Sequence, residues 1–355
     1  MKMCSYLRNI LLLVLLNEIH LHTAHGQLSD DYTGHSNADS DENAFDPHNL
    51  LKYYATSQTT KEEEVYVFPP LSRLDPGDVG TIVSVELSPG RWFDRITRAV
   101  KPPIFEIPDF LSDEECDHII NSAARNGLGT SQIYGEDNEP DPNTQDIFRV
   151  SQQTWLNRNN LGGMFLDNLQ NKLSTLLNLS KEIIKGSESM QVVNYLPNGH
   201  YHAHLDSTRN TGNKPCCFQS SCPTPPGPEC CRICRYATVL YFLNNVDGGG
   251  ETAFPLADAD ENTMTRFLEG GNLAHQWRNL SNFCHNSSVV IGPKRGTAIM
   301  WYSHLMEAET NYLGEIDDYS YHGGCDVTKG TKWIANNWIN AATYNERFVK
   351  SIWVD

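Results

Sequence analysis

From residue 190 onward, the sequence consists of short segments of β-branched and aromatic residues that Gly, Pro and Asn separate. These segments are MQVVNYLP, HYHAHLD, ATVLYFLNNV, SVVIGP, GTAIMWY and KWIANNWIN. Segments of this length and composition, bounded by residues that favour turns, are typical of β-strands. The pattern predicts a domain built on many short strands, and no internal repeat divides it.

Two helices are predicted ahead of these strands. The first begins after Ser112, an N-cap that forms a capping box with Glu115, and ends at Gly127. The second covers roughly residues 160 to 178. Each carries one apolar stripe, which predicts that both pack on the sheet. The stripes are Cys116, Ile119, Ile120, Ala123 and Ala124 in the first helix and Phe165, Leu166, Leu169, Leu173, Leu176 and Leu177 in the second.

Two separate segments contain the residues of a candidate metal site. His204 and Asp206 lie two apart in a predicted strand, so their side chains point to the same face. His322 follows far downstream in another strand-like segment. Two histidines and one carboxylate hold Fe(II) on one face and leave coordination positions open. Because His200 and His202 share the predicted face of His204, a cupin-like pair of His202 and His204 is an alternative, as is a polar strand face without a metal.

Lys332 adds a cation to this set. It lies ten residues after His322, with glycines between them that let the chain turn. A cation near such an iron can bind the far carboxylate of 2-oxoglutarate, and it favours His204 and Asp206 as the ligand pair. The set predicts an Fe(II)- and 2-oxoglutarate-dependent dioxygenase. With the many short strands, it predicts an α+β fold with a double-stranded β-helix (jelly-roll) core that the N-terminal helices buttress.

Length and charge limit the domain count and the partners. The chain has 355 residues, of which 39% are hydrophobic, and a formal net charge of −17. This length suits one large domain with additions or two domains. With no basic patch, the sequence predicts no nucleic-acid partner.

The N-terminus has the layout of a secretory signal peptide. Lys2 and Arg8 precede an apolar run at 10–16, and small residues follow near Gly26. We expect residues 1–26 to be this signal peptide. The apolar run is too short to span a bilayer unaided, so membrane attachment by an uncleaved anchor is the alternative.

The remaining chain divides into three parts by composition. Residues 27–95 are predicted to be a variable acidic leader, whose polar first part is typical of disorder. Residues 96–345 are predicted to form the dioxygenase domain. Residues 346–355 remain as a C-terminal tail.

The cysteines and sequons point to the same compartment as the signal peptide. Six of the ten cysteines lie between residues 216 and 234. In an oxidising compartment this cluster predicts a disulfide-pinned loop; a zinc knuckle with the CxxC of Cys231 is the alternative. Nine cysteines survive signal cleavage, so one thiol is free or pairs with another chain. Sequons predict N-glycosylation at Asn178, Asn279 and Asn286.

Residues from about 102 to 345 resemble prolyl 4-hydroxylases. The resemblance rests on PPIFEIPDFLSDEEC, FRVSQQTWL, VVNYLPNGHYHAHLDS, CRYATVLYFLNNVDGGGETAFP, KRGTAIMWY and DDYSYHGGCDVTKGTKWIANNWIN. GHYHAHLDS and GTKWIANNWIN resemble most the transmembrane, endoplasmic-reticulum branch. The resemblance implies a double-stranded β-helix, iron ligands at His204, Asp206 and His322, a 2-oxoglutarate clamp at Lys332, and dependence on L-ascorbate.

The resemblance also implies roles around the metal. Tyr195 and Tyr241 match tyrosines that hydrogen-bond 2-oxoglutarate in hypoxia-factor hydroxylases; both could instead be core aromatics. Arg149 and Ser151 match a segment that touches the peptide in plant and algal enzymes, although Arg149 could form a surface salt bridge. Trp338 is expected to line the substrate pocket or to lie in the core.

Two features depart from the transmembrane branch. The vertebrate enzyme carries calcium-binding EF-hands between the first helix and the FRVS segment. Only about twenty residues occupy that gap here, and they contain no EF-hand calcium loop. Calcium binding is therefore not expected. The N-terminus also looks cleavable, which puts the membrane anchor in doubt.

The predicted activity is 4-hydroxylation of peptidyl proline, coupled to decarboxylation of 2-oxoglutarate by O2 at a non-haem iron. The alternatives are another peptidyl hydroxylase of this class, such as a lysyl hydroxylase, and an inactive binding module. The expected partner is a proline-containing peptide or protein. The expected location is the lumen of the endoplasmic reticulum, with its membrane or secretion as alternatives.

Overall fold

A computed structural model describes residues 66–132, 148–210, 214–217 and 231–349. The signal peptide, most of the acidic leader, most of the short segment in place of the EF-hands, Cys222 and Cys230 lie outside the described residues. The following description concerns the described residues alone.

The described chain consists of short strands with helices in three groups. The strands are β1 (Tyr66–Val67), β2 (Ile82–Ser88), β3 (Arg91–Val100), β4 (Pro103–Ile107), β5 (Gly129–Thr130), β6 (Arg149–Val150), β7 (Gln152–Leu156), β8 (Met190–Tyr195), β9 (His200–His204), β10 (Arg235–Phe242), β11 (Gly248–Gly249), β12 (Thr252–Phe254), β13 (Val289–Ile291), β14 (Ala298–Tyr302), β15 (His304–Met306), β16 (Leu313–Ile316), β17 (His322–Gly324), β18 (Val327–Lys329), β19 (Lys332–Asn340) and β20 (Phe348–Val349). The helices are α3 (Asp113–Asn126), α5 (Arg158–Leu161), α6 (Gly163–Leu177), α7 (Lys181–Lys185), α8 (Glu261–Leu268), α9 (Asn272–Arg278), α10 (Leu280–Phe283) and the 3-10 turns η1 (Cys284–Asn286), η2 (Asp318–Ser320) and η3 (Tyr344–Glu346).

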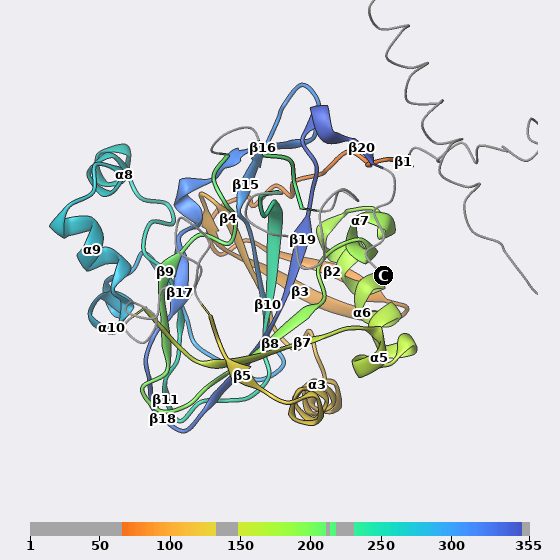
Figure 1. Cartoon of the computed structure of the whole chain (residues 1–355), viewed down its shortest axis with the longest axis horizontal. Helices are drawn as coiled ribbons and strands as arrows, with labels where there is room; N and C mark the ends of the chain where they lie inside the picture. Colours follow the sequence, from red (N-terminus) through yellow and green to blue (C-terminus); the bar gives the residue numbers. More distant parts are fainter. Residues whose placement is uncertain (1–65, 133–147, 211–213, 218–230, 350–355) are drawn as a thin grey trace, which may run out of the picture. The chain divides into compact units, whose positions relative to one another are not determined.

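Two antiparallel sheets form the centre of the fold (Figure 1). The larger has nine strands in the order β2-β3-β4-β14-β10-β19-β8-β7-β5, and the smaller has five in the order β13-β12-β17-β9-β6. Buried side chains from both sheets, including Val193, Phe242, Phe254 and Ile334, make one apolar core. The sheets remain open at their edges and do not close into a barrel. The predicted jelly-roll of the α+β class is confirmed.

Helices cover the other face of the large sheet, as predicted. In α3, the Ser112 hydroxyl accepts from the amide of Glu115 and the Glu115 carboxylate accepts from the amide of Ser112, so the capping box is present. The second predicted helix is divided at Gly162 into α5 and α6. Leu169, Leu173 and other apolar side chains of α6 pack into a second core on this outer face of the large sheet, which we call the main core.

The large sheet begins earlier in the sequence than expected. A domain boundary is predicted between residues 95 and 96, but β3 crosses that position and pairs with both β2 and β4. Leu87 and Phe93 are buried in the main core, so this hairpin belongs to the folded unit. The predicted boundary is therefore corrected. At the other end, β20 pairs with β1 and ties the first residues of the predicted tail to the fold.

A small helical lobe, α8 to η1, interrupts the small sheet between β12 and β13 and was not predicted (Figure 1). Its apolar side chains Met264, Phe267 and Ala274 pack on Leu256 and Tyr321. A disulfide joins Cys284 of the lobe to Cys325, just after β17. These helices have four to eight residues, too few for a strong helical period in the sequence.

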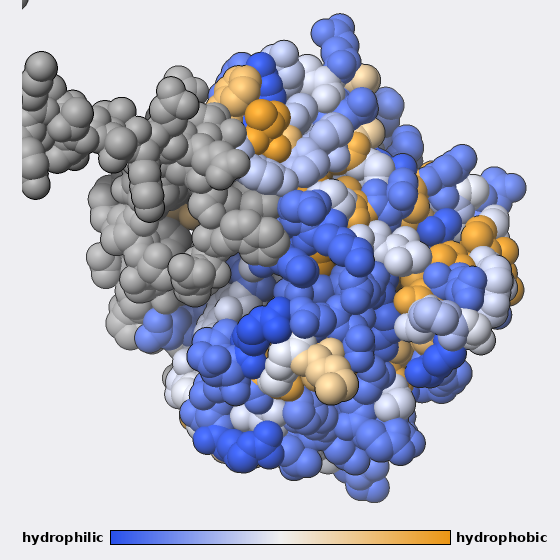
Figure 2. Space-filling model, turned by 90° about the vertical axis from the view of Figure 1, so that its right-hand side faces the viewer, coloured by the Kyte–Doolittle hydropathy of each residue, from blue (hydrophilic) through white to orange (hydrophobic). Residues whose placement is uncertain are grey.

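None of the helices in the described part of the chain is both long and apolar enough to cross a membrane. The face drawn in Figure 2 is mainly hydrophilic, with apolar residues in small separate patches.

Candidate metal and 2-oxoglutarate site

The small sheet brings the three predicted ligands together. His204 ends β9, His322 begins β17, and the two residues are paired across the strands. The His204 Nε2–Asp206 Oδ1 distance is 3.7 Å and the His322 Nε2–Asp206 Oδ2 distance is 3.5 Å. One ligand atom from each residue lies within 4.8 Å of the others. This spacing fits one metal ion held by a two-His-one-carboxylate set.

Main-chain carbonyls fix how both imidazoles point. Nδ1 of His204 donates to the carbonyl of His202 at 2.8 Å, and Nδ1 of His322 donates to the carbonyl of Ser320 at 2.9 Å. Each ring therefore carries its proton on Nδ1 and presents the Nε2 lone pair to Asp206. Outer hydrogen bonds of this kind orient metal-binding histidines and set the tautomer.

Asp206 and His322 are in the protonation states that a metal requires. Burial lowers the pKa of His322 to about 4, so its imidazole is neutral at physiological pH. Burial alone would raise the pKa of Asp206, but His322, His204 and Arg235 together hold it well below its usual range. Asp206 Oδ2 also accepts a hydrogen bond from the Thr238 hydroxyl at 2.6 Å. The ionised Asp206 carboxylate and the neutral His322 imidazole can bind a cation without first losing protons.

The alternative pair of His202 and His204 is not brought together. The pairing of β9 with β17 shifts register, because His204 lies opposite His322 and Tyr201 opposite Gly324. The extra residue in β9 is a bulge, which interrupts the alternation of side chains. His202 instead stacks on His200, with ring centroids 4.7 Å apart, and it is absent from the group of ligand atoms.

Lys332 is buried beside Tyr195 and faces the strand that carries His322. Lys332 of β19 is paired with Tyr195 of β8, and Lys332 is 1% exposed. A Cβ placed on Gly324 of β17 would lie 3.5 Å from Lys332 Nζ and 3.9 Å from the Tyr195 hydroxyl. Burial lowers the pKa of Lys332 to about 7, although Glu251 opposes the shift. The ammonium and the phenol together offer the donors that a carboxylate of 2-oxoglutarate needs.

Tyr241 is not part of this group. On β10, Leu240 and Phe242 lie opposite Asn336 and Ile334, whereas Tyr241 points to the other face of the sheet. Its ring stacks on Phe110 and its hydroxyl donates to Asn337 at 3.0 Å. The 2-oxoglutarate role that the resemblance implied for Tyr241 therefore does not agree with the structure. The strand is buried on both faces, so composition does not show which face a side chain occupies.

Tyr201 was missed by the sequence analysis. Its ring lies parallel to His204, with centroids 3.6 Å apart, and the Arg149 guanidinium lies over it at 4.5 Å. Strict alternation would put residues three apart on opposite faces. The bulge in β9 brings the rings of Tyr201 and His204 to one side, and the sequence pattern of alternating residues does not indicate a bulge.

Arg149 and Ser151 lie together at the edge of the small sheet. Arg149 is 7% exposed; its Nε donates to the Ser151 hydroxyl at 3.1 Å and its Nη2 to Gln153 Oε1 at 3.2 Å. Among the described residues it forms no ion pair, in contrast to the surface salt bridge considered as an alternative. Through Tyr201, Arg149 is connected to the metal ligands.

Trp338 is buried on the face of β19 that also carries Lys332. It is 6% exposed. Its ring packs on Trp155 at 5.5 Å between centroids, and the Arg235 guanidinium covers it at 3.4 Å. Trp155 is 39% exposed, so the pair of Trp338 and Trp155 forms an aromatic wall that reaches the surface.

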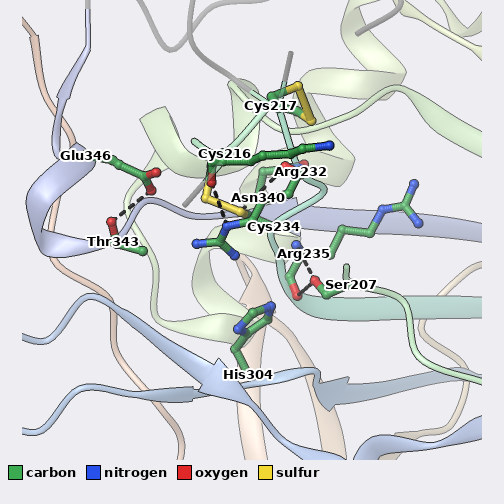
Figure 3. Close-up of a disulfide and its surroundings, with 12 residues drawn as sticks. Ser207, Cys216, Cys217, Arg232, Cys234, Arg235, His304, Asn340, Thr343 and Glu346 are labelled. Atoms are coloured by element: carbon green, nitrogen blue, oxygen red, sulfur yellow. Dashed lines mark hydrogen bonds between the residues drawn. A yellow bond between two sulfur atoms is a disulfide. The ribbon is translucent and has the colours of Figure 1, made fainter. Parts of the chain in front are cut away.

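Disulfides involve most of the described cysteines. Cys216 is bonded to Cys234 and Cys217 to Cys231 at the base of the loop between β9 and β10 (Figure 3). Both cysteines of the CxxC are thus oxidised, so they cannot form a zinc knuckle. Cys116 is the free thiol of the described part, and it is buried. Burial raises its pKa to about 11, so it stays protonated.

The three predicted glycosylation sites differ in exposure. Asn178 and Asn286 are exposed. Asn279 is half-buried, and its side-chain oxygen is enclosed without a hydrogen-bond partner.

The fold and the ligand set define a class of enzyme that comparison with known proteins supports. Residues 190–340 match the 2OG-Fe(II) oxygenase superfamily. The protein is accordingly an Fe(II)- and 2-oxoglutarate-dependent dioxygenase, and the residues present fit both groups.

Relatives define the family within this class. The chain is 31% identical over 367 residues to the transmembrane prolyl 4-hydroxylase of Mus musculus, covering 76% of this chain and 70% of that protein. It is 31% identical over 246 residues to prolyl 4-hydroxylase 2 of Arabidopsis thaliana, covering 69% of this chain and 70% of that protein. A solved structure of the viral collagen prolyl hydroxylase of Paramecium bursaria Chlorella virus-1, with 2-oxoglutarate, is 27% identical, covers 68% of this chain and 96% of that chain, and has a TM-score of 0.41. The chain belongs to the prolyl 4-hydroxylase family.

Proposed function

We propose that this protein hydroxylates C4 of prolyl residues in a peptide or protein and couples this reaction to decarboxylation of 2-oxoglutarate. The observation that carries the proposal is the arrangement of a buried Lys332 and Tyr195 on one sheet facing His204 and His322 on the other, with Asp206 just after the strand of His204. Family membership supports proline as the target residue.

The roles of the residues follow from their placement. His204, Asp206 and His322 would hold Fe(II), and Lys332 with Tyr195 would bind the far carboxylate of 2-oxoglutarate. When bound, iron with 2-oxoglutarate and O2 supplies the oxidising chemistry, which forms succinate and CO2 and places one oxygen atom on the substrate.

Apolar side chains keep bulk water away from this centre. The Trp301 ring lies 4.4 Å and the Phe254 ring 5.7 Å from the His322 ring, centroid to centroid. Both aromatic side chains are fully buried. A dry wall behind His322 strengthens the electrostatic interactions of the ligand set and limits side reactions with water.

The peptide would lie along Arg149, Ser151 and Trp338. The Arg149 guanidinium offers donors for the peptide backbone, and Ser151 orients it by accepting from Nε. Trp155, which is 39% exposed and packs on the buried Trp338, offers apolar surface for a proline ring. Tyr201 lies between Arg149 and His204, which would align this peptide site with the metal.

The compartment is also a proposal. Disulfides and exposed sequons support the secretory pathway, with the lumen of the endoplasmic reticulum as the working location. An uncleaved anchor or secretion would be distinguished by membrane extraction and by assay of the culture medium. Ascorbate would be required to restore iron that uncoupled turnover has oxidised.

Mass spectrometry tests the activity. The purified protein is incubated with Fe(II), 2-oxoglutarate, ascorbate and proline- or lysine-containing peptides, with the His204→Ala variant as the matched control. We expect one added oxygen on proline, located by fragmentation, together with stoichiometric succinate. Oxygen on lysine would indicate the lysyl alternative, and absence of both product and succinate would indicate an inactive binding module.

A further inference from the structure

Arg235, the first residue of β10, contacts Glu188, the main chain of Asp206 and the ring of Trp338. It has no role in the proposal above. Its Nε and Nη2 donate to the two carboxylate oxygens of Glu188 at 2.7 and 2.6 Å. Its Nη1 donates to the main-chain carbonyl of Asp206 at 3.3 Å. Its Cζ lies 3.4 Å from the centroid of the Trp338 ring. One side chain thus contacts a metal ligand's backbone and the aromatic wall at the same time.

Asp206 needs such a support because it lies beyond the end of its strand. β9 ends at His204, so ladder hydrogen bonds fix the main chain of His204 but not that of Asp206. His322 begins β17 and is also fixed by pairing. Asp206 is therefore the ligand whose backbone position depends on contacts outside the sheet.

The base of the following loop holds Arg235 next to this segment (Figure 3). The Ser207 hydroxyl accepts from the Arg235 amide at 2.8 Å and donates to the Arg235 carbonyl at 3.1 Å. The Cys216–Cys234 disulfide closes the loop one residue before Arg235. Both ends of the loop are thereby clamped, and Arg235 is placed within reach of the residue that precedes Ser207.

We propose that Arg235 is a positioning residue that fixes the Asp206 main chain for metal binding and links it to the Trp338 wall. Arginine is suited to this role because its planar group carries five donors and stacks on an aromatic face. The Arg235 side chain is only 12% exposed, so water competes weakly for these bonds. Lysine could pair with Glu188 but could not keep the two-point bond, the stack and the Asp206 contact together.

Metal affinity without peptide tests this inference. Mn(II) binding to the full chain is measured by calorimetry, with thermal unfolding in parallel, for Arg235→Lys and Arg235→Gln. Loss of a partner that orients a ligand lowers metal affinity by about 10–100-fold, and we expect a loss in this range for both variants. The inference rests on the proposed metal site, but not on which residue is hydroxylated.

Arg295→Lys is the matched control. Arg295 is partly buried and donates to Asp113, to Asp117 and to the Leu243 carbonyl, none of which belongs to the site. We expect this control to lower the melting temperature while leaving Mn(II) affinity unchanged. Glu188→Gln is the second variant, which removes the charge partner but keeps Arg235, and we expect a smaller loss of affinity from it.

The outcomes separate positioning from general stability. Lower affinity in both Arg235 variants and unchanged affinity in the Arg295 control support the inference. Wild-type affinity in Arg235→Lys overturns it, as does an equal loss in the control at a matched drop in melting temperature. If the Arg235 variants do not fold, unchanged affinity in Glu188→Gln overturns it. Failure of prolyl hydroxylation with intact metal affinities would overturn the proposed function alone.

Discussion

Individual residues at the metal site gain their properties from the main chain around them. The carbonyls of His202 and Ser320 each lie two residues before the histidine that they orient. Because each carbonyl is two residues from its histidine, the contact forms within the same short segment and needs no other helix or strand. The orientation of the two imidazoles therefore depends on the main chain at the ends of β9 and β17.

The first prediction concerns the choice of ligands. His204→Ala and Asp206→Ala should each lower Mn(II) affinity by more than about 100-fold, beyond the effect of losing an outer partner. His202→Ala should change affinity by less than about threefold, because His202 stacks on His200 outside the ligand group. Calorimetry measures all three variants. Loss of metal in His202→Ala with retention in His204→Ala would reverse the assignment.

The second prediction is a pH dependence of 2-oxoglutarate binding. The pKa of Lys332 is lowered from 10.5 to about 7 by burial, so the ammonium is charged below pH 7 and neutral above it. Binding of the co-substrate carboxylate favours the charged form, so a proton must be taken up above pH 7. The Kd for 2-oxoglutarate should rise with pH above about 7, approaching tenfold per pH unit.

The control for this pH dependence is Lys332→Ala. It should weaken 2-oxoglutarate binding strongly at pH 6.5, flatten the rise of Kd above pH 7 and leave Mn(II) binding intact. The measurement is calorimetric titration of the Mn(II)-loaded protein. A pH profile that is identical in wild type and variant would assign the proton to another group.

Among the elements, the lobe of α8 to η1 packs against the segments that carry the ligands. Leu205, between His204 and Asp206, and Tyr321, next to His322, both contact its apolar cluster. Arg278 lies over the Tyr321 ring at 5.2 Å and donates to its hydroxyl. The Cys284–Cys325 disulfide adds a covalent connection between the lobe and the end of β17.

The third prediction concerns this disulfide. The cysteines that it joins are 41 residues apart in sequence, whereas Cys217 and Cys231 are 14 residues apart. Because the larger loop gains more entropy in the unfolded chain, removing Cys284–Cys325 by a double change to Ser should lower the free energy of unfolding by about 4 kcal/mol. The same change at Cys217 and Cys231 should cost clearly less, because the enclosing Cys216–Cys234 bond still closes nearly the same loop in the unfolded chain. Urea unfolding compares them, and an equal or reversed order would contradict the loop-length account.

For the whole molecule, the jelly-roll places metal ligands on one sheet and the Lys332 cation on the other. The proposed metal and co-substrate site would thereby be assembled from residues 195, 204, 206, 322 and 332, which no single supersecondary unit contains. Helices on the outer face of the large sheet and the disulfides at its periphery stabilise this arrangement from outside the site.

The fourth prediction concerns the cell compartment. After expression in a secretory host, glycopeptides should be found at Asn178 and Asn286, which are exposed, and rarely at Asn279, whose side-chain oxygen is enclosed. Enzymatic deglycosylation in heavy-oxygen water, followed by mass spectrometry, measures the occupancy of each site. An unglycosylated and fully reduced chain from such cells would exclude the secretory route.

Much of the site was predictable because its signals are local or involve specific residue types. The capping box of α3 and the succession of strands follow from spacing and from turn-forming residues. The candidate ligand set and Lys332 were also indicated by spacing, which left the pair of His202 and His204 open as an alternative. The fold class follows in turn, since many short strands together with a two-His-one-carboxylate set are compatible with few architectures.

What the sequence by itself determined was which residues could do chemistry; the tertiary structure decided which face each occupies and what supports it. β8, β10 and β19 are buried along nearly their whole length, so alternation of polar and apolar residues cannot reveal their inner face. Tyr241 was misplaced for this reason, and Tyr201 was missed because one bulge reverses the alternation. The disulfide pairing and the position of Arg235 depend on which distant segments meet, and that depends on packing across both sheets.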